Sequence, residues 1–131
     1  TMPLFQSRYV PDCFYLNELD KYPDDLQNYV LKPLYSFAGS GVKLNISESD
    51  LDELEDKSNF ILQRKVNYEP IIETPTGPAK FEIRMLMLWE QGSGEVRIVN
   101  NLVRISKGEM IGVRYNKDKD WVGASVAFFK K

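Results

Sequence analysis

The chain has 131 residues, which is about the size of one ordinary domain. Hydrophobic residues make up 43% and the formal net charge is -2, so the composition is that of a folded protein with no general attraction to nucleic acid or to an anionic membrane. No apolar run reaches the roughly 18 residues that a spanning helix needs, so we expect no membrane partner. The single cysteine, Cys13, suits a reducing compartment, and we expect a cytoplasmic protein.

The chain contains no histidine. This excludes Ser-His-Asp and Cys-His catalysis, histidine metal sites and histidine acid–base chemistry within these residues. A lone cysteine likewise excludes an internal disulfide and a cysteine-based metal cluster, and its simplest interpretation is a small buried side chain. The remaining chemistry is that of carboxylates, lysine, arginine and the backbone, which suits the handling of phosphate groups.

Hydrophobic periodicity and breaker residues predict an α+β chain built from short elements. One helix is expected at residues 16–26, interrupted by Pro23. A clearer helix is expected at residues 47–56, where Ser47 or Ser49 can cap it and early acidic residues suit the positive end of the helix dipole. The expected strands, in chain order, are residues 28–33, 42–46, 59–66, 79–89, 95–105, 109–115 and 121–129.

A loop rich in proline and glycine, residues 67–78, lies between the two halves of the chain. No linker is strong enough to divide the chain, so we expect a single domain or fragment.

A second loop of small residues, residues 36–41, follows the first expected strand. Its Gly39-Ser40-Gly41 segment fits two interpretations. It could be a hairpin turn that needs positive φ, or a flexible flap whose backbone N–H groups close over phosphates. The spacing matches neither a Walker loop nor a dinucleotide-binding GxGxxG motif. Lys32 ends the strand before this loop and therefore lies near it.

Residues 79–89 and 95–105 predict an antiparallel hairpin. With a five-residue loop, Arg84 lies opposite Asn100, and a one-residue change in the loop places it opposite Asn101. The residues expected to share one face are Lys80, Glu82, Arg84, Asn100 and Arg104. The residues expected to enter a core from the other face are Phe81, Ile83, Met85 and Met87.

The charged face of this hairpin has two open interpretations. One-sided antiparallel sheets have a solvated face, and charged residues belong there. Alternatively, arginine, lysine and amide groups fit phosphates, and a carboxylate fits magnesium. Aromatic residues are plentiful, but aromatics at strand positions usually form core and no basic stripe accompanies them, so we expect no nucleic-acid partner.

The order of these segments resembles the ATP-grasp family. Residues 29–34, which contain Lys32-Pro33, followed by residues 37–42, are similar to that family's strand, Lys-Pro, small loop and Gly-x-Gly-Val segment. Residues 60–66 resemble the strand that becomes the adenine hinge. Phe81-Glu82-Ile83-Arg84-Met85 resembles the acidic-x-Arg strand, and residues 100–108 resemble the strand that follows it.

Two flanking segments extend the resemblance to about residues 9–125. Residues 10–16 are similar to the family's Val-Pro, strand, helix lead-in, and residues 118–123 resemble its circularly permuted branch. The resemblance implies an ATP-grasp-like fold, which is a mostly antiparallel sheet with a few short helices. Residues 9–66 would form the strand–glycine loop–strand flap and the hinge, and residues 79–129 the C-terminal antiparallel sheet.

The resemblance also implies roles for individual residues. Lys32 would contact the nucleotide phosphates, and the backbone around residues 63–66 would hold adenine. Glu69 or Glu73 would hold ribose. Arg84 and Arg104 would be the catalytic pair that neutralises a phosphate or an acyl-phosphate. The residues implied in nucleotide binding are Lys32, Gly39, Ser40, Gly41, Gln63, Lys65 and Glu69.

The sequence departs from the family pattern at two places. Arg64 stands where the hinge glutamate is expected. The Glu-x-Asn magnesium pair is missing, and Val99-Asn100-Asn101 stands in that region. If Mg²⁺ is bound, Glu82 with Asn100 or Asn101 is the implied ligand set.

The family activates a carboxylate with ATP through an acyl-phosphate and joins it to an amine or a thiol, by positioning and electrostatics. We therefore expect the ATP-binding portion of an ATP-dependent carboxylate–amine or carboxylate–thiol ligase. Its ligands would be ATP, Mg²⁺ and an unknown carboxylate, and the remaining domains of a longer chain would complete it. The alternative is a non-catalytic interaction module that keeps the fold, motivated by the missing magnesium pair and the short length.

Overall fold

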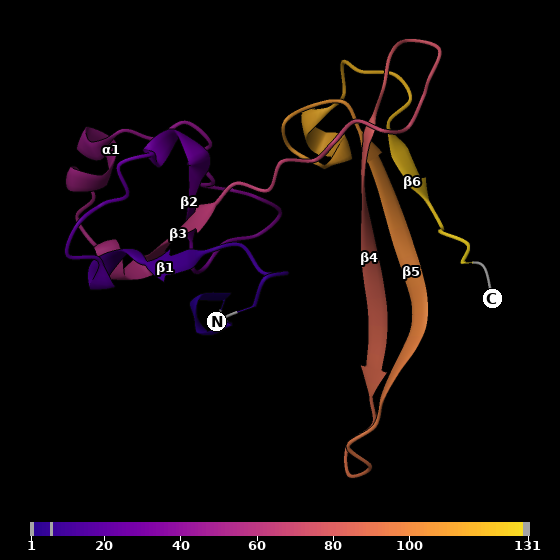
Figure 1. Ribbon diagram of the computed structural model, residues 1–131, viewed down its shortest axis with the longest axis horizontal. Helices are drawn as coiled ribbons and strands as arrows, with labels where there is room; N and C mark the ends of the chain where they lie inside the picture. The colour runs from indigo at the N-terminus through magenta and orange to yellow at the C-terminus, as the bar shows by residue number, and fades with distance from the viewer. Residues whose placement is uncertain (1, 6, 130–131) are drawn as a thin grey trace. The chain divides into compact units, whose positions relative to one another are not determined.

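The computed structural model describes residues 2–5 and 7–129, and its chain forms two compact units, Thr1–Asn67 and Tyr68–Lys131 (Figure 1). The boundary falls at the start of the proline- and glycine-rich loop. Each unit contains one three-stranded antiparallel sheet and short helical segments, so the chain is α+β. No helix in the described residues is long and apolar enough to cross a membrane.

The sheet of the first unit has the strand order β1-β3-β2. Its central strand places Leu62 between Phe14 and Leu31, so these three side chains share one face. The elements of this unit are η1 (Met2–Leu4), β1 (Cys13–Tyr15), η2 (Leu16–Glu18), η3 (Leu26–Asn28), β2 (Tyr29–Pro33), α1 (Glu48–Asp52), η4 (Lys57–Asn59) and β3 (Phe60–Arg64).

The core of the first unit lies between that sheet face and the helical segments. Leu51 of α1 and Leu62 of β3 are fully buried. Each such leucine contributes about 1.5–3 kcal/mol by leaving water. The buried cluster consists of Leu16, Leu26, Tyr29, Leu31, Leu51 and Leu62.

The two expected helices have different outcomes. The one at residues 47–56 is confirmed but shorter, as α1, and Ser47 with Asp50 forms a complete capping box at its start. The helix expected at residues 16–26 is wrong, because only the single turns η2 and η3 form near its ends. Pro23 lies between these turns, where it would remove a helical hydrogen bond and clash with the preceding turn.

The strands expected at residues 28–33 and 59–66 are confirmed as β2 and β3. The strand expected at residues 42–46 is wrong. Only Lys43 pairs, through two backbone hydrogen bonds of 3.0 Å with Leu31. The chain then leaves the sheet, because Ile46 packs against the core and Ser47 begins α1.

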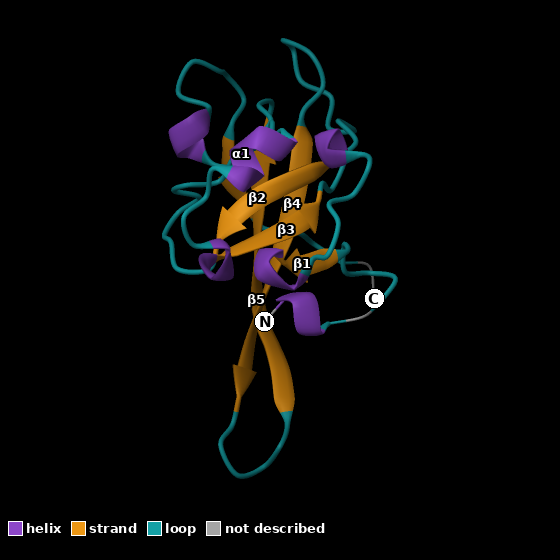
Figure 2. Ribbon diagram, turned by 90° about the vertical axis from the view of Figure 1, so that its left-hand side faces the viewer, coloured by secondary structure: helices purple, strands orange, loops and turns teal. Residues whose placement is uncertain are grey.

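The sheet of the second unit has the order β4-β5-β6. Its elements are β4 (Lys80–Trp89), β5 (Val96–Ser106), η5 (Val113–Tyr115) and β6 (Gly123–Ser125). The two long strands, β4 and β5, confirm the expected hairpin (Figure 2). β6 is a short part of the strand expected at residues 121–129. The strand expected at residues 109–115 is wrong, because this stretch is a loop that ends in η5.

The expected hairpin register is wrong by two residues. Glu82 pairs with Arg104 and Arg84 with Leu102. One residue of the shift comes from the loop, since Trp89 pairs with Val96 and the loop has positive φ at two glycines. The other comes from a β-bulge between Leu86 and Met87, where β5 carries one extra residue.

A shift of two residues keeps each side chain on its face, because side chains alternate with period two. The expected sharing of one face by Lys80, Glu82, Arg84, Asn100 and Arg104 is therefore confirmed. The expected core on the other face is wrong at Ile83, Met85 and Met87, which are exposed. β6 pairs only with Val103–Ile105 of β5, so most of the hairpin extends beyond the three-stranded part of the sheet (Figure 1).

Candidate functional site

Lys32 lies on the face of the first sheet that is opposite the leucine core. Its ammonium donates a 2.8 Å hydrogen bond to Oε1 of Gln63 on the neighbouring strand. Cys13 of β1 lies directly opposite Gln63 and shares this face. Gln63 and Cys13 are buried and Lys32 is half-buried, so a cation is held at a largely desolvated sheet surface.

Burial lowers the pKa of the Lys32 ammonium, and the nearby Cys13 opposes this effect. Burial also raises the pKa of the Cys13 thiol, which the charge of Lys32 partly counteracts. The ion pairs of residues 2–5 and 7–129 include none with Lys32. Its positive charge therefore rests on a neutral amide, which leaves it able to gain from an anionic ligand.

The loop after β2 folds back over the end of that strand. Gly39 and Gly41 have φ of 78° and 72°, and Ala38 has φ of 53°. A Cβ at Gly41 would lie 3.1 Å from Cγ of Pro33, the residue after Lys32. Short turns hold the loop together, with Ser40 N–H donating to Phe37 O over 3.0 Å. The glycine loop is thus a compact turn packed against Pro33.

The hinge segment is occupied by structural contacts. The N–H of Lys65 donates to Asn28 O over 2.7 Å, and the N–H of Arg64 donates to Asp12 O over 2.8 Å. The Arg64 guanidinium forms ion pairs with Asp25 at 3.0 Å and Asp12 at 3.3 Å. It also lies 4.7 Å from the centre of the Tyr29 ring. Arg64 therefore joins β3 to the segments around it in the place of the expected hinge glutamate.

Glu69 belongs to a different unit of the chain from the other residues implied in nucleotide binding. It is exposed and belongs to the second unit, whereas Gln63 and Lys65 belong to the first. Its carbonyl accepts a 3.0 Å hydrogen bond from Ile71 N–H, which forms a tight turn.

Glu82 is the centre of the charged face in the second unit. Nε of Arg104 donates to Oε1 of Glu82 over 2.6 Å, and a second nitrogen of Arg104 also contacts this oxygen. Arg84 lies 3.7 Å from the same oxygen. The Glu82 and Arg104 side chains are about one quarter exposed, at 21% and 30%, whereas Arg84 is 54% exposed. Arg84 is therefore the more accessible of the two arginines.

Other groups on this face are also paired. Lys80 donates to Gly108 O over 3.2 Å. Tyr68 has its pKa raised by burial and by the charge of Glu82, although Arg104 lowers it.

The two asparagines proposed as magnesium ligands point to opposite faces. Asn100 pairs with Leu86 and shares the face of Glu82. Asn101 lies on the other face, where its amide donates to Ala127 O over 3.1 Å and accepts from Ala127 N–H over 2.7 Å. These bonds continue the pairing of β5 with the chain after β6. In the described part of the chain, no three Asp, Glu or Cys residues gather in a metal-binding cluster.

Asn116 is a buried polar residue that sequence reasoning did not identify. Its Oδ1 accepts from Gly108 N–H at 2.7 Å and from the Ser106 hydroxyl at 3.1 Å. Its Nδ2 donates to Met110 O and Gly112 O, each at 2.8 Å. One side chain thereby closes the loop between β5 and η5. The only sequence signal is its type, because asparagine commonly bonds loop backbone.

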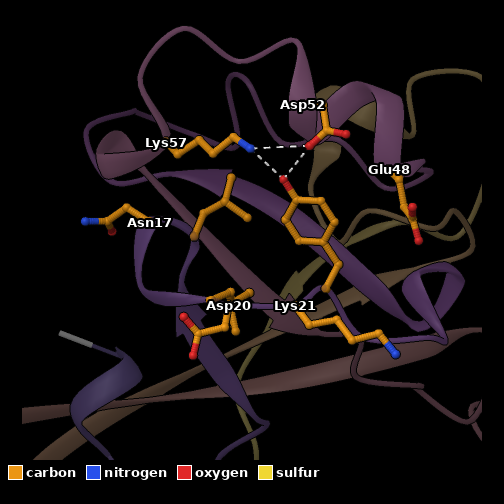
Figure 3. A pocket seen from close by; sticks show the side chains of 9 residues that line it. Asn17, Asp20, Lys21, Glu48, Asp52 and Lys57 are labelled. Carbon is orange, nitrogen blue, oxygen red and sulfur yellow. Dashed lines mark hydrogen bonds and ion pairs between the residues drawn. The ribbon is translucent and has the colours of Figure 1, made fainter.

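A surface hollow of about 450 Å³ lies in the first unit, away from the predicted residues. Among the residues that line it, Lys57 and Asp52 point toward one another, while the Glu48 side chain points away from both (Figure 3). The Tyr22 hydroxyl joins them, accepting from Lys57 over 2.6 Å and donating to Asp52 over 2.8 Å. These three groups satisfy one another, so their arrangement ties η4 to α1 without needing a ligand.

Comparisons with known proteins give no relative for this chain, since no family model, no curated protein and no solved structure matches it.

Proposed function

We propose that this chain is the ATP-binding portion of an ATP-grasp-like ligase, which joins a carboxylate to an amine or a thiol. The observation that carries the proposal is the half-buried Lys32 ammonium, which donates its hydrogen bond to the neutral Gln63 amide. Its lowered pKa reflects a cation that burial deprives of water. A phosphate group would replace that lost hydration with a counter-charge.

The glycine loop supplies the second part of a phosphate site. Backbone N–H groups in successive turns with positive φ form concave anion-binding surfaces. Ala38, Gly39 and Gly41 have positive φ in this loop, and Gly41 lies against Pro33. Lysine and loop therefore belong to one short segment of the first unit.

Within the second unit, Arg84 and Arg104 are the residues to which the resemblance assigns the neutralisation of an acyl-phosphate. Arg104 is fixed by Glu82, which orients its guanidinium, whereas Arg84 is half exposed and loosely held at 3.7 Å. Arginine suits this role because it is always charged and can make two parallel bonds to a phosphate. The acceptor would be an unknown carboxylate.

The donor set does not fit a magnesium site formed by this chain. The Glu82 carboxylate already has two guanidinium groups around it, and the Asn101 amide is engaged on the other face. Magnesium is usually held by one or two carboxylates together with substrate phosphates. We therefore assign no magnesium ligand among these residues.

The alternative function is a non-catalytic interaction module. The exposed apolar side chains of the β4–β5 hairpin favour it, because such a surface is typical of protein–protein contacts. Nucleotide binding distinguishes the two functions.

The test is a calorimetric titration of Mg-ATP into the chain and into two variants. Lys32→Ala removes the proposed phosphate contact and should weaken binding by about 1.5–3 kcal/mol, the value of a charge-assisted hydrogen bond. Lys21→Ala is the control, because Lys21 is exposed and pairs only locally with Asp24. Circular dichroism should show that both variants are folded.

Equal affinity of Lys32→Ala and the unchanged chain would disprove the role of Lys32. An absence of heat with millimolar ATP would reject nucleotide binding by this chain and leave the interaction module.

A further inference from the structure

The β4–β5 hairpin carries an exposed apolar segment on an unpaired strand edge. β4 pairs with β5 on one side, and no other strand of the described chain lies along its other side. The exposure of its apolar residues increases toward the hairpin loop, to 58% at Met87 and 76% at Trp89. The exposed apolar residues of this strand are Ile83, Met85, Leu86, Met87, Leu88 and Trp89. A long, exposed apolar edge is a template for pairing with another strand.

We propose that a second copy of this chain pairs with β4 along this edge, antiparallel and centred on Met87. When a strand pairs with its own copy around a two-fold axis, each residue lies opposite the residue that is equally far from the axis on its other side. With Met87 at the axis, Leu86 lies opposite Leu88 of the second copy, and Met85 lies opposite Trp89. The two sheets would join into one sheet with the order β6-β5-β4-β4-β5-β6.

The charges at the ends of the apolar segment support this partner and this register. Centring on Met87 places Arg84 opposite Glu90 of the second copy, and symmetry gives this pair twice. Both side chains are available, since Arg84 is 54% and Glu90 62% exposed. Arg84 has only a 3.7 Å contact with Glu82 in its own chain, and Glu90 a 3.1 Å contact with the exposed Arg97. Opposite charges directly across a strand pair stabilise it.

Neighbouring registers lack this complementarity. An axis at residue 86 would place Glu82 opposite Glu90, and an axis at residue 84 would place Arg84 opposite itself. An axis at residue 85 would place Arg84 opposite Leu86, and it would match Glu90 only with Lys80, whose ammonium already donates to Gly108 O. An axis at residue 83 does match Glu82 with Arg84, but it leaves the most exposed residues, Met87 to Trp89, beyond the paired segment. Of these registers, the one at Met87 pairs the two exposed charged residues, Arg84 and Glu90, with each other and also pairs the exposed apolar residues between them.

Side-chain packing at this register is also favourable. Met85 would place its thioether beside the Trp89 indole of the second copy, and sulfur–aromatic contacts are attractive. The Leu86–Leu88 pairs lie on the other face, so both faces of the joined strands gain apolar contacts. The dimer does not depend on nucleotide binding, and its test uses association alone.

The first experiment measures the association of the full chain by sedimentation equilibrium. The unchanged chain should form dimers, and Arg84→Glu and Glu90→Arg should each weaken dimerisation at least about tenfold through like-charge contacts. The double variant Arg84→Glu with Glu90→Arg restores opposite charges and should recover dimers. The double variant carries both substitutions in every chain. If it forms dimers again, the single variants lost dimerisation through like-charge contacts and not through misfolding. Tryptophan fluorescence confirms that each variant is folded.

The second experiment tests the register by cross-linking. Cysteine at position 87 lies opposite its own copy, so Met87→Cys should form a covalent dimer under mild oxidation. Cysteine at position 89 would lie opposite Met85 of the second copy. The cysteine at position 89 of that copy would be about 13 Å away along the strands, so Trp89→Cys should not form a covalent dimer. The native Cys13 is buried and serves as the common background.

A chain that stays monomeric at the highest attainable concentration overturns the proposal. So does a dimer that both charge reversals leave intact, or one in which Trp89→Cys cross-links and Met87→Cys does not.

Discussion

Glu82 of β4 and Arg104 of β5 lie directly opposite each other, and Nε of Arg104 donates to Oε1 of Glu82 over 2.6 Å. Cross-strand pairs of this kind hold the register of a hairpin, because a shift of the strands would separate the charges. The pair is largely sheltered from water, which strengthens the interaction relative to an exposed pair. It therefore links the stability of the second unit to the position of the proposed catalytic arginine.

Replacing Glu82 by glutamine should destabilise the second unit by about 1–3 kcal/mol, since Arg104 would lose its charged acceptor. Urea unfolding followed by tryptophan fluorescence measures this change, because Trp89 and Trp121 both belong to that unit. Glu90→Gln is the matched control. It loses only an exposed contact with Arg97 and should change the unfolding free energy by less than about 1 kcal/mol in the monomer. Equal changes in the free energy of unfolding would show that the Glu82–Arg104 pair stabilises the unit no more than an exposed ion pair does.

The glycine loop gives a second prediction. Gly41→Ala should destabilise the first unit and weaken ATP binding, because φ of 72° disfavours a side chain and the new Cβ would crowd Pro33. Gly94→Ala is a control at nearly the same φ, 71°, with no heavy atom within 4 Å of the new Cβ. Backbone strain of about 1 kcal/mol should be common to both variants.

The destabilisation by Gly41→Ala in excess of that by Gly94→Ala measures the steric contact of the new Cβ with Pro33. Urea unfolding by circular dichroism gives the stabilities, and calorimetry with Mg-ATP gives the affinities. If Gly41→Ala costs no more than Gly94→Ala, the loop is free to move away from Pro33.

The strands that the sequence predicted correctly include two short apolar ones, β2 and β3, and the long strands of the hairpin, which have the most regular pattern. Phe81, Ile83 and Met85 alternate with charged residues, and this period alone identifies β4 and assigns its faces. The register was not predictable, because it depends on the conformation of two loop glycines and on the extra residue at the bulge. The exposure of Met87 was not predictable either. The alternation of side chains shows which face of the strand is apolar, but it does not show whether another part of the chain covers that face.

The local clusters show the same limit. Lys32 and Gln63 were both proposed as ligands from the resemblance, yet their mutual hydrogen bond depends on strand order, which the sequence pattern does not reveal. Arg64 was noticed only as a departure from the family pattern. Its partners, Asp12 and Asp25, are far from it in the sequence and come together only through the sheet.

The lowered pKa of Lys32 predicts a pH dependence of stability. When burial lowers the pKa of a lysine, the unfolded chain binds more protons than the folded chain between the folded and the unfolded pKa. The free energy of unfolding therefore rises with pH across that window. Compared with a Lys32→Met variant, the unchanged chain should gain stability as the pH increases toward the ordinary lysine pKa of about 10.4. Urea unfolding at a series of alkaline pH values measures the difference.

Lys21 is the control for that experiment, because its shift has the opposite sign. A hydrogen bond and the charge of Asp24 raise the pKa of Lys21, so any stability it adds is present at lower pH and is lost as the pH rises through its folded pKa. The difference between the unchanged chain and Lys21→Met should accordingly not grow with pH. A Lys32→Met difference that is independent of pH would mean that water reaches the Lys32 ammonium.

The loop that follows β5 should depend on Asn116 more than on any charged residue in it. Asn116→Ala removes four hydrogen bonds, with two carbonyls, an N–H and a hydroxyl, at a residue that is 2% exposed. Each of these four groups keeps another bond, in which the Ser106 hydroxyl or Tyr115 N–H takes part. Since a hydrogen bond contributes about 0.5–1.5 kcal/mol net, the loss of four bonds should cost about 3 kcal/mol. Tryptophan fluorescence during urea unfolding measures it, with Asn100→Ala as the control at an exposed position of the same unit. Equal stability of the two variants would show that the loop is held by its backbone alone.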